Sequence, residues 1–172
     1  MAELWDVYDE NKNKTGKIAE RGITTLKQGG EYHIVVAGII LNSKKEILIS
    51  QRAAHKEHPL KWECNGGSIL VGETSLEGIL RELEEELGLK FSKEDAIFLK
   101  EIKSNRFPNF KDLWLFKKDI DIKEIEFKDG EAIAAKWVSI DEFINMYNND
   151  EIVKTVDFGI EEYNKVLELL KN

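Results

Sequence analysis

The chain has 172 residues, 42% of them hydrophobic and 34% charged, and its formal net charge is −8. This length and composition predict a single globular domain over residues 1–172 with a core of ordinary size. The acidic charge argues against nonspecific binding to nucleic acid or to an anionic membrane surface.

The single cysteine, Cys64, excludes an internal disulfide and fits a reducing cytosol. Glu3, Asp6 and Asp9 interrupt any apolar run near the first residue, so we expect no signal peptide. No segment approaches the roughly 18 apolar residues that a membrane span requires. These features predict a cytoplasmic protein.

Residues 1–21 predict a β-hairpin that lies outside the main core. Residues 4–9 roughly alternate between apolar and polar side chains, and a turn at residues 11–16 leads to a returning strand at residues 17–20. Three side chains of this hairpin need a surface to pack on: Trp5, Val7 and Tyr8. Packing within the chain is the simpler interpretation, and a homodimer contact is the alternative.

The main core is expected in residues 32–172. Its first segment, residues 32–41, is a nearly unbroken apolar run rich in Val and Ile, which is typical of a buried strand. After a turn, residues 46–51 predict a second strand that pairs with the first as a hairpin inside a larger sheet. Gly66 and Gly67 come next, where backbone oxygens can approach a ligand or a metal closely.

A helix is expected to begin near Ser75. Thr74 and Glu77 have the spacing of a capping box, and Gly88 stands where a helix commonly ends in a left-handed cap. Apolar side chains recur between these ends at three- and four-residue spacing and make one stripe. The stripe consists of Leu76, Ile79, Leu80, Leu83 and Leu87.

Charged residues of this helix form two rows beside the stripe. The row farther from the stripe alternates in sign, so that its arginine can bridge both neighbours: Glu77, Arg81 and Glu85. Glu82 and Glu86 form the nearer row, and Gly78 clears space one turn before Glu82. Like charges at this spacing repel each other, and clustered carboxylates suit a hard divalent cation such as Mg²⁺. The helix pattern alone leaves a solvated acidic face as the alternative.

The rest of the chain predicts three more strands and two more helices. The strands are expected at residues 97–103, 113–117 and 131–138. Residues 104–112 read as a loop, Ser139 and Glu142 cap a short helix, and residues 156–170 form a final amphipathic helix. Strands flanked by helices, with both hairpins and long connections, predict an α/β fold with a mixed sheet between helices.

Residues 67–89 resemble the Nudix box. Gly67 is followed after five residues by Glu73, and after seven more by the run Arg-Glu-Leu-Glu-Glu-Glu-Leu-Gly-Leu at residues 81–89, with every defining position filled. The resemblance implies an α/β/α sandwich, in agreement with the strand and helix pattern. It also implies a pyrophosphohydrolase that uses Mg²⁺, with Mn²⁺ as a substitute, to cleave a diphosphate linkage in a nucleoside diphosphate derivative or a related small molecule.

The resemblance also assigns roles to box residues. Glu82 and Glu86 are the expected metal ligands, Glu85 is the third, and the backbone carbonyl of Gly66 completes the metal site. Glu85 and Glu86 are also catalytic candidates, because box glutamates serve as the general base in some members. Four further positions are expected to be structural: Gly67, Glu73, Arg81 and Gly88.

A glutamate outside the box serves as the base in other members, and Glu131 is the best external candidate. It follows a glycine turn near a strand, and an ordinary exposed glutamate is the alternative. Arg52 and Lys56, in the polar segment over residues 52–61, are expected to offer positive charge to a diphosphate, with a solvated loop as the alternative.

Several residues of the loop at 104–112 are candidates for substrate contact. Arg106 lies beside Phe107, whose ring can stack on a base. The rings of Phe110 and Trp114 share this interpretation, with core packing as the alternative for Trp114. His33 lies in an apolar run, where a histidine is more often a satisfied core residue than a ligand.

Two other functions remain as alternatives. One is a non-catalytic Nudix domain that binds a nucleotide and regulates a partner, although such domains commonly lose box glutamates that this chain retains. The other is the isopentenyl diphosphate isomerase branch, which residues 52–67 also resemble. That isomerase needs a cysteine where this chain has Gly67, and Cys64 does not match the position. The identity of the diphosphate substrate stays open.

Overall fold

The structure, a computed structural model, describes residues 2–153 and Glu168. The expected helix at residues 156–170 therefore lies outside the described residues, apart from Glu168. The strands are β1 (Leu4–Tyr8), β2 (Lys14–Glu20), β3 (His33–Leu41), β4 (Ile47–Arg52), β5 (Trp62–Glu63), β6 (Gly66–Ser68), β7 (Ala96–Lys103), β8 (Asn109–Lys117) and β9 (Ala132–Val138). The helices are α1 (Ser75–Leu87) and α2 (Ile140–Asn148), with short 3-10 turns η1 (Lys93–Asp95) and η2 (Ile122–Glu124).

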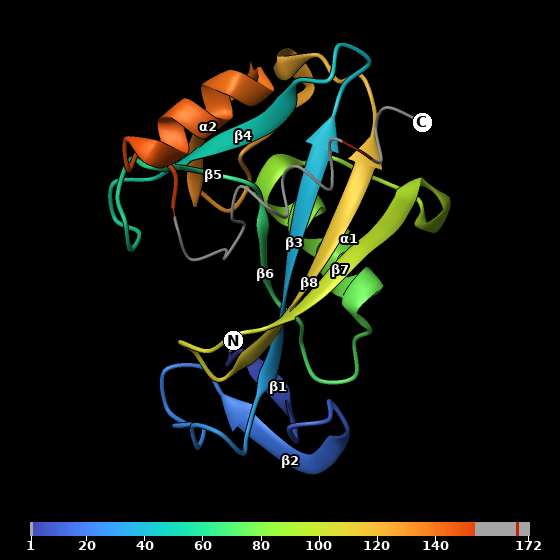
Figure 1. Cartoon of the computed structure of the whole chain (residues 1–172), viewed down its shortest axis with the longest axis vertical. Coiled ribbons are helices and arrows are strands. Elements are labelled where there is room, and N and C mark those ends of the chain that lie inside the picture. Colours follow the sequence, from blue (N-terminus) through green and yellow to red (C-terminus); the bar gives the residue numbers. More distant parts are fainter. Residues whose placement is uncertain (1, 154–167, 169–172) are drawn as a thin grey trace.

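The main sheet has seven strands in the order β5–β4–β3–β8–β7, with β6 beside β3 and β9 beside β4 (Figure 1). β3 and β8 run parallel, in register from the His33–Asn109 pair to the Leu41–Lys117 pair. The other pairs in this sheet are antiparallel, so the expected mixed sheet is confirmed. No helix within the described ranges is long and apolar enough to cross a membrane.

The expected hairpin of β3 and β4 forms only at its closed end. The two strands share the pair Leu41–Ile47, after which β4 pairs along its length with β9. The reason is that β6 takes the same edge of β3 farther back along that strand, from the Val35–Ser68 pair to the Ala37–Gly66 pair. Beyond the Leu41–Ile47 pair, β3 and β4 therefore have different partners in the sheet.

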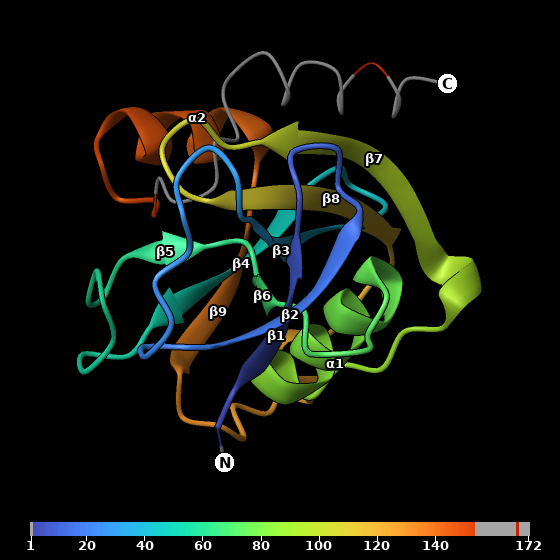
Figure 2. The ribbon, with the colours of Figure 1, turned by 90° about the horizontal axis from the view of Figure 1, so that it is seen from below.

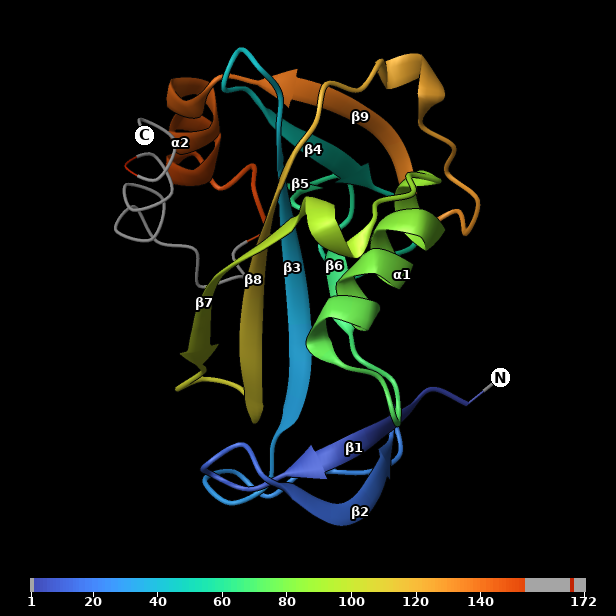
Figure 3. The same ribbon diagram turned by 90° about the vertical axis from the view of Figure 1, so that its right-hand side faces the viewer.

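Two helices cover opposite faces of the main sheet (Figure 3). The apolar stripe of α1 is fully buried at Ile79, Leu83 and Leu87, and packs in one core cluster with Ile34 and Val36 of β3. α2 places its buried side chains in a second cluster, with alternate residues of β3: Phe143 and Met146 against Ala37, Ile39 and Leu41. The α/β/α arrangement follows from this period-two division of β3.

The predicted ends of α1 are confirmed. Thr74 Oγ1 accepts a hydrogen bond from the Glu77 backbone N–H, and the Glu77 carboxylate accepts one from the Thr74 N–H at 3.0 Å. Gly88 has φ 68°, in the left-handed region that favours glycine, and its N–H donates to the Glu84 carbonyl. These two caps define the ends of α1, and so the turns on which Glu82, Glu85 and Glu86 lie.

The N-terminal hairpin forms its own two-stranded sheet, as expected, and lies across the end of the main sheet where β3 begins (Figure 2). Val7 is 2% exposed and belongs to a small cluster with Ala19 and Leu26, while Tyr8 joins the main core and exchanges two backbone hydrogen bonds with Tyr32. The chain itself covers Val7 and Tyr8, in agreement with the simpler interpretation of packing within the chain.

The loop expected at residues 104–112 is shorter than predicted. β8 begins at Asn109 rather than at residue 113, because its first residues already pair with β3. Asp112 is consequently 2% exposed, and its carboxylate is bound at 2.7 Å by Lys12 from the hairpin turn. Lys12 also binds Glu101 at 2.6 Å, so that one lysine ties the hairpin to two strands of the main sheet.

Replacing Lys12 by methionine should lower the free energy of unfolding by about 3 kcal/mol, because the buried Asp112 carboxylate would lose its ion-pair partner. The matched control is Lys14→Met, which removes the more exposed pair with Asp6 and should cost at most about 1 kcal/mol. Urea denaturation of the three proteins measures both values. Equal losses in the two variants would contradict the proposed anchor.

Candidate functional site

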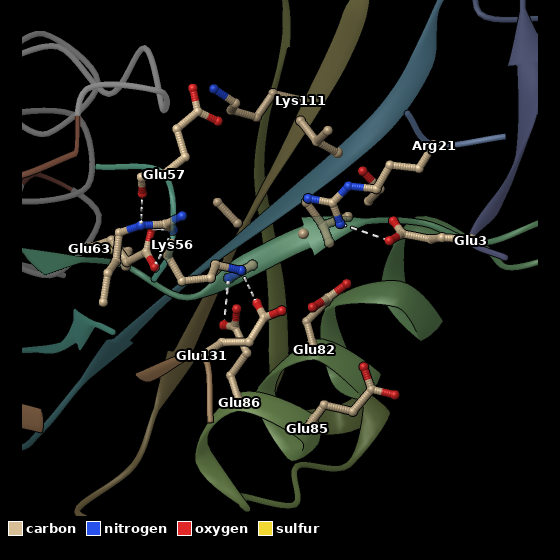
Figure 4. A pocket seen from close by; sticks show the side chains of 18 of the residues that line it. Glu3, Arg21, Lys56, Glu57, Glu63, Glu82, Glu85, Glu86, Lys111 and Glu131 are labelled. Atoms are coloured by element: carbon tan, nitrogen blue, oxygen red, sulfur yellow. Dashed lines mark hydrogen bonds and ion pairs between the residues drawn. The ribbon is translucent and has the colours of Figure 1, made fainter. Parts of the chain in front are cut away.

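One wide cleft, of about 1470 Å³, opens between α1, the start of β3, the segment between β4 and β5, and the N-terminal hairpin (Figure 4). It exceeds the roughly 300–1,000 Å³ of an ordinary small-molecule pocket. Most of the site residues expected from the sequence line it: Arg52, Lys56, Gly66, Gly67, Arg81, Glu82, Glu85, Glu86, Arg106, Phe107 and Glu131. Glu73 and Gly88 are not among its lining residues.

Glu82 points from α1 toward β6. Its side chain is 14% exposed, and a Cβ added to Gly67 would lie 2.3 Å from its Oε1 atom. Position 67 therefore requires glycine for the carboxylate to stay where it is. Burial raises the pKa of Glu82 to about 7, against the opposing effect of the Arg81 charge.

Glu86, one turn later, is 8% exposed and is held by amide donors. Its Oε2 atom accepts hydrogen bonds from Asn65 Nδ2 at 2.8 Å and from the Gly66 backbone N–H at 3.2 Å. Burial raises the pKa of Glu86 to about 8. Asn65 is itself buried and also donates to Ser50, so a second layer of polar groups, absent from the sequence-based prediction, orients this carboxylate.

Arg81 binds several of the residues in segment 67–89. Its guanidinium donates to Glu73 at 2.7 and 3.0 Å, to Glu82 and Glu85 at 2.9 Å each, and to the Ser68 carbonyl at 2.9 Å. The predicted bridge to Glu77 is absent from its described bonds, because the Glu77 carboxylate caps the helix at Thr74 and pairs with Lys93. Arg81 thus joins α1, β6 and the loop before α1.

Gly78 has a different neighbour from the one predicted. A Cβ at this position would lie 2.5 Å from the side chain of Ile69, which is 2% exposed. The glycine therefore lets α1 pack closely on the segment after β6. It clears space for core packing, not for a ligand beside Glu82.

The carboxylates of α1 suit a hard divalent cation by their chemistry. Glu82 and Glu86 offer oxygen ligands, and their burial disfavours the charged carboxylate form. A bound cation would favour the charged form instead. Over residues 2–153, no three acidic, histidine or cysteine side chains converge closely enough to enclose a metal. Arg81 holds Glu82 and Glu85, while Asn65 and Gly66 hold Glu86, so metal binding would exchange some of these contacts.

Glu131 lies in the cleft, where it forms an ion pair with Lys56. Figure 4 shows this pair on the side of the cleft next to Glu86. Arg52 also lines the cleft, but its Nη1 atom binds both carboxylate oxygens of Glu63 at 2.7 Å and its Nε atom donates to the Glu57 carbonyl. Arg52 therefore connects β4 to the segment after it and to β5.

Of the three aromatic residues proposed to contact the substrate, Phe107 lines the cleft and the other two do not. Phe107 is 41% exposed, lines the cleft and lies 5.1 Å from the Arg106 guanidinium. Phe110 is buried against Tyr32, and Trp114 donates from its indole N–H to Ser75 on α1. Neither ring lines the cleft, so the structure gives Phe110 and Trp114 no position from which to stack on a base there.

The hairpin contributes cleft residues that the sequence did not indicate. Arg21 follows β2, and its side chain is 60% exposed and hydrogen-bonded to Glu3 at 2.7 Å. The Glu3 hydrogen bond raises the pKa of Arg21, and the charges of Glu131 and Glu82 act in the same direction. Figure 4 shows the guanidinium reaching over the cleft toward Glu82. Only the tertiary fold brings residues 21 and 82 together.

Comparison with known proteins places most of the chain in one family. A family model described as NUDIX domain matches residues 31–156. An uncharacterized Nudix hydrolase of Listeria monocytogenes is 32% identical over 154 residues, which cover 88% of each chain. The 8-oxo-dGTP diphosphatase of Escherichia coli is 44% identical over 55 residues, which cover 32% of this chain and 43% of the diphosphatase.

Solved structures share the fold. The crystal structure of DR0079 from Deinococcus radiodurans aligns with a TM-score of 0.71 at 20% sequence identity, over 86% of this chain and 90% of that one. This likeness supports the α/β/α fold described above.

Proposed function

Since the chain belongs to the Nudix family, we propose that it is a Mg²⁺-dependent hydrolase that cleaves a diphosphate linkage in a nucleoside diphosphate derivative or a related pyrophosphate compound. The observation that carries this proposal is a pair of carboxylates, the half-buried Glu82 and the buried Glu86, which line one wide cleft beside the glycines of β6. The Listeria monocytogenes relative is named a Nudix hydrolase. The Escherichia coli relative, which matches over 55 residues, is named a diphosphatase.

Glu82 and Glu86 would hold the divalent cation, with Glu85 as a third ligand and the Gly66 carbonyl beside them. Glu85 is the most exposed of the three carboxylates, which suits a ligand that exchanges Arg81 for a cation. When bound, such an ion neutralises phosphate charge and lowers the pKa of a water molecule. Mn²⁺ would serve in place of Mg²⁺, because both accept oxygen ligands.

Glu131 is our proposed general base. Its carboxylate would take the proton of the attacking water, and Lys56 would orient that carboxylate through their ion pair. Glu85 and Glu86 remain the box alternatives for this role. Arg21 and Arg106, which also line the cleft, would attract the phosphate oxygens. Phe107 would offer its exposed ring to the group that the diphosphate carries.

The isomerase alternative has little support in the geometry. Gly67 stands at the position of the required cysteine, and burial raises the pKa of Cys64 to about 12, so its thiol stays protonated. The non-catalytic alternative would gain if the protein bound nucleotides but turned over none of a broad panel of diphosphate compounds with Mg²⁺ or Mn²⁺.

Glu82→Gln and Glu86→Gln should each lower the metal-dependent release of phosphorylated product by roughly two orders of magnitude or more, since each removes a charged ligand from the cation. Both variants should also lose the rise in unfolding temperature that Mg²⁺ gives the parent protein. A substrate panel with Mg²⁺ and a thermal-shift titration measure the two effects.

The matched control is Glu94→Gln, an exposed glutamate of η1 outside the cleft, which should keep the parent's activity and its response to Mg²⁺. The metal assignment fails if Glu82→Gln and Glu86→Gln behave like this control.

Glu131→Gln should lower kcat by about 100-fold or more while leaving KM and the response to Mg²⁺ near the parent's values, because a general base acts in the chemical step. Steady-state kinetics on the best substrate of the panel separate these quantities. A kcat within twofold of the parent would return the role to Glu85 or Glu86.

A further inference from the structure

The three carboxylates proposed to bind the cation are held by two kinds of partner. Glu82 and Glu85 each accept a hydrogen bond from the charged guanidinium of Arg81 at 2.9 Å. Within residues 2–153, Glu86 accepts hydrogen bonds from neutral donors only, the Asn65 amide at 2.8 Å and the backbone N–H of the next residue at 3.2 Å. A metal ion would repel a nearby guanidinium, whereas neutral N–H donors can stay in place beside it. The partners of Glu86 are therefore compatible with a bound cation.

Both hydrogen bonds of Glu86 fall on the same carboxylate oxygen, Oε2. The other oxygen, Oε1, has no hydrogen-bond partner in the described part of the chain, and it is not one of the enclosed unpaired atoms found there. Glu86 lines the cleft, and Figure 4 shows its side chain rising into the cleft from α1. One oxygen of this carboxylate is thus occupied by the protein, and the other is open to an ion.

The Asn65 side chain is fixed from behind. It is 3% exposed, and its backbone carbonyl accepts a hydrogen bond from the Gly38 N–H at 2.9 Å. Its amide nitrogen donates to Ser50 Oγ on β4 at 2.9 Å as well as to Glu86. A side-chain amide has two N–H groups, so these two bonds use both of them. Asn65 therefore holds Oε2 of Glu86 in one orientation without adding a charge to the site.

The number of oxygens that a carboxylate offers affects the cation that it prefers. Mg²⁺ demands nearly octahedral geometry with ligands at about 2.0–2.1 Å, whereas Ca²⁺ takes more ligands, at about 2.3–2.6 Å, and often binds both oxygens of one carboxylate. Oε2 of Glu86 would have to give up its N–H donors before it could join Oε1 on one ion. Holding Glu86 to a single oxygen therefore favours the smaller cation.

We propose that Asn65 is a positioning residue that restricts Glu86 to binding a cation through Oε1, and that the site consequently prefers Mg²⁺ or Mn²⁺ to Ca²⁺. This inference rests on the proposed function, because it takes Glu86 as a metal ligand. It adds a physical cause for the choice of metal. Asn65 precedes segment 67–89 and reaches Glu86 only in the folded chain.

The direct test compares the Mn²⁺ and Ca²⁺ affinities of the parent protein and of Asn65→Leu, which keeps the size of the side chain and removes both N–H groups. Electron paramagnetic resonance of free Mn²⁺ gives the first affinity without substrate, and competition of Ca²⁺ against Mn²⁺ gives the second. The variant should bind Mn²⁺ about tenfold more weakly and Ca²⁺ at most about twofold more weakly. The Mn²⁺ to Ca²⁺ affinity ratio should therefore fall about fivefold or more.

The ratio separates positioning from a purely structural role. A smaller folded fraction, or a change in the charge of Glu86, would lower both affinities in the same proportion and leave the ratio unchanged. An unchanged ratio in Asn65→Leu would therefore overturn the proposal. If circular dichroism shows that Asn65→Leu does not fold, Asn65→Ala also lacks the amide, and it should lower the same ratio.

The matched control is Asn42→Leu. The Asn42 amide donates to the Glu46 carboxylate at 2.7 Å, so the same kind of pair exists at the turn between β3 and β4, where neither residue lines the cleft. The control should lose stability but keep the parent's Mn²⁺ to Ca²⁺ ratio. An equal fall of the ratio in Asn42→Leu and Asn65→Leu would overturn the role assigned to Asn65.

Failure of this inference can be told apart from failure of the proposed function. A parent protein that hydrolyses a diphosphate compound with Mg²⁺, together with an unchanged ratio in Asn65→Leu, would remove the inference and leave the function intact. A lowered ratio in Asn65→Leu would support the inference even if no compound of the panel were hydrolysed, because the affinities are measured without turnover. A parent protein that binds no Mn²⁺ would overturn the inference and the metal assignment together.

Discussion

Two carboxylates, Glu82 and Glu86, are held where their charged forms are disfavoured, and much of the molecule serves to keep them there. The apolar stripe of α1 packs on β3 through fully buried side chains, which holds the helix in place on that face of the sheet. Gly67 leaves room for one carboxylate, and Asn65 holds the other. Arg81 then bonds the helix to β6 and to the loop before it. Such a site has a strong electrostatic reason to take up a cation.

The cleft around these carboxylates is assembled from segments far apart in the chain. Lys56 and Glu131 form an ion pair in it from two different loops, and Arg21 reaches in from the end of the hairpin. The hairpin can contribute because Lys12 binds the buried Asp112 and Tyr8 pairs with Tyr32. An element that looks like an appendage in the sequence is therefore one wall of the site. Substrate selection would then depend on residues that the box does not contain.

Local signals predicted α1 well, because its determinants are close in sequence. Thr74 and Glu77 cap one end, Gly88 caps the other, and the leucine spacing gives the buried face. Long-range pairing produced the errors. The early start of β8 at Asn109 depends on β3, the partner of β4 is β9 because β6 occupies β3, and Gly78 faces Ile69. The positions of Arg21 in the cleft and of Asn65 beside Glu86 depend on neighbours that no local sequence pattern reveals.

Crystals of the protein soaked in Mn²⁺ test directly whether Glu82 and Glu86 bind a divalent cation in this cleft, because manganese gives an anomalous signal and takes oxygen ligands like Mg²⁺. We expect an anomalous peak at about 2.0–2.3 Å from carboxylate oxygens of both Glu82 and Glu86, with Arg81 displaced from Glu82 or Glu85. A cleft without a peak, or a peak bound only by glutamates outside α1, would contradict it.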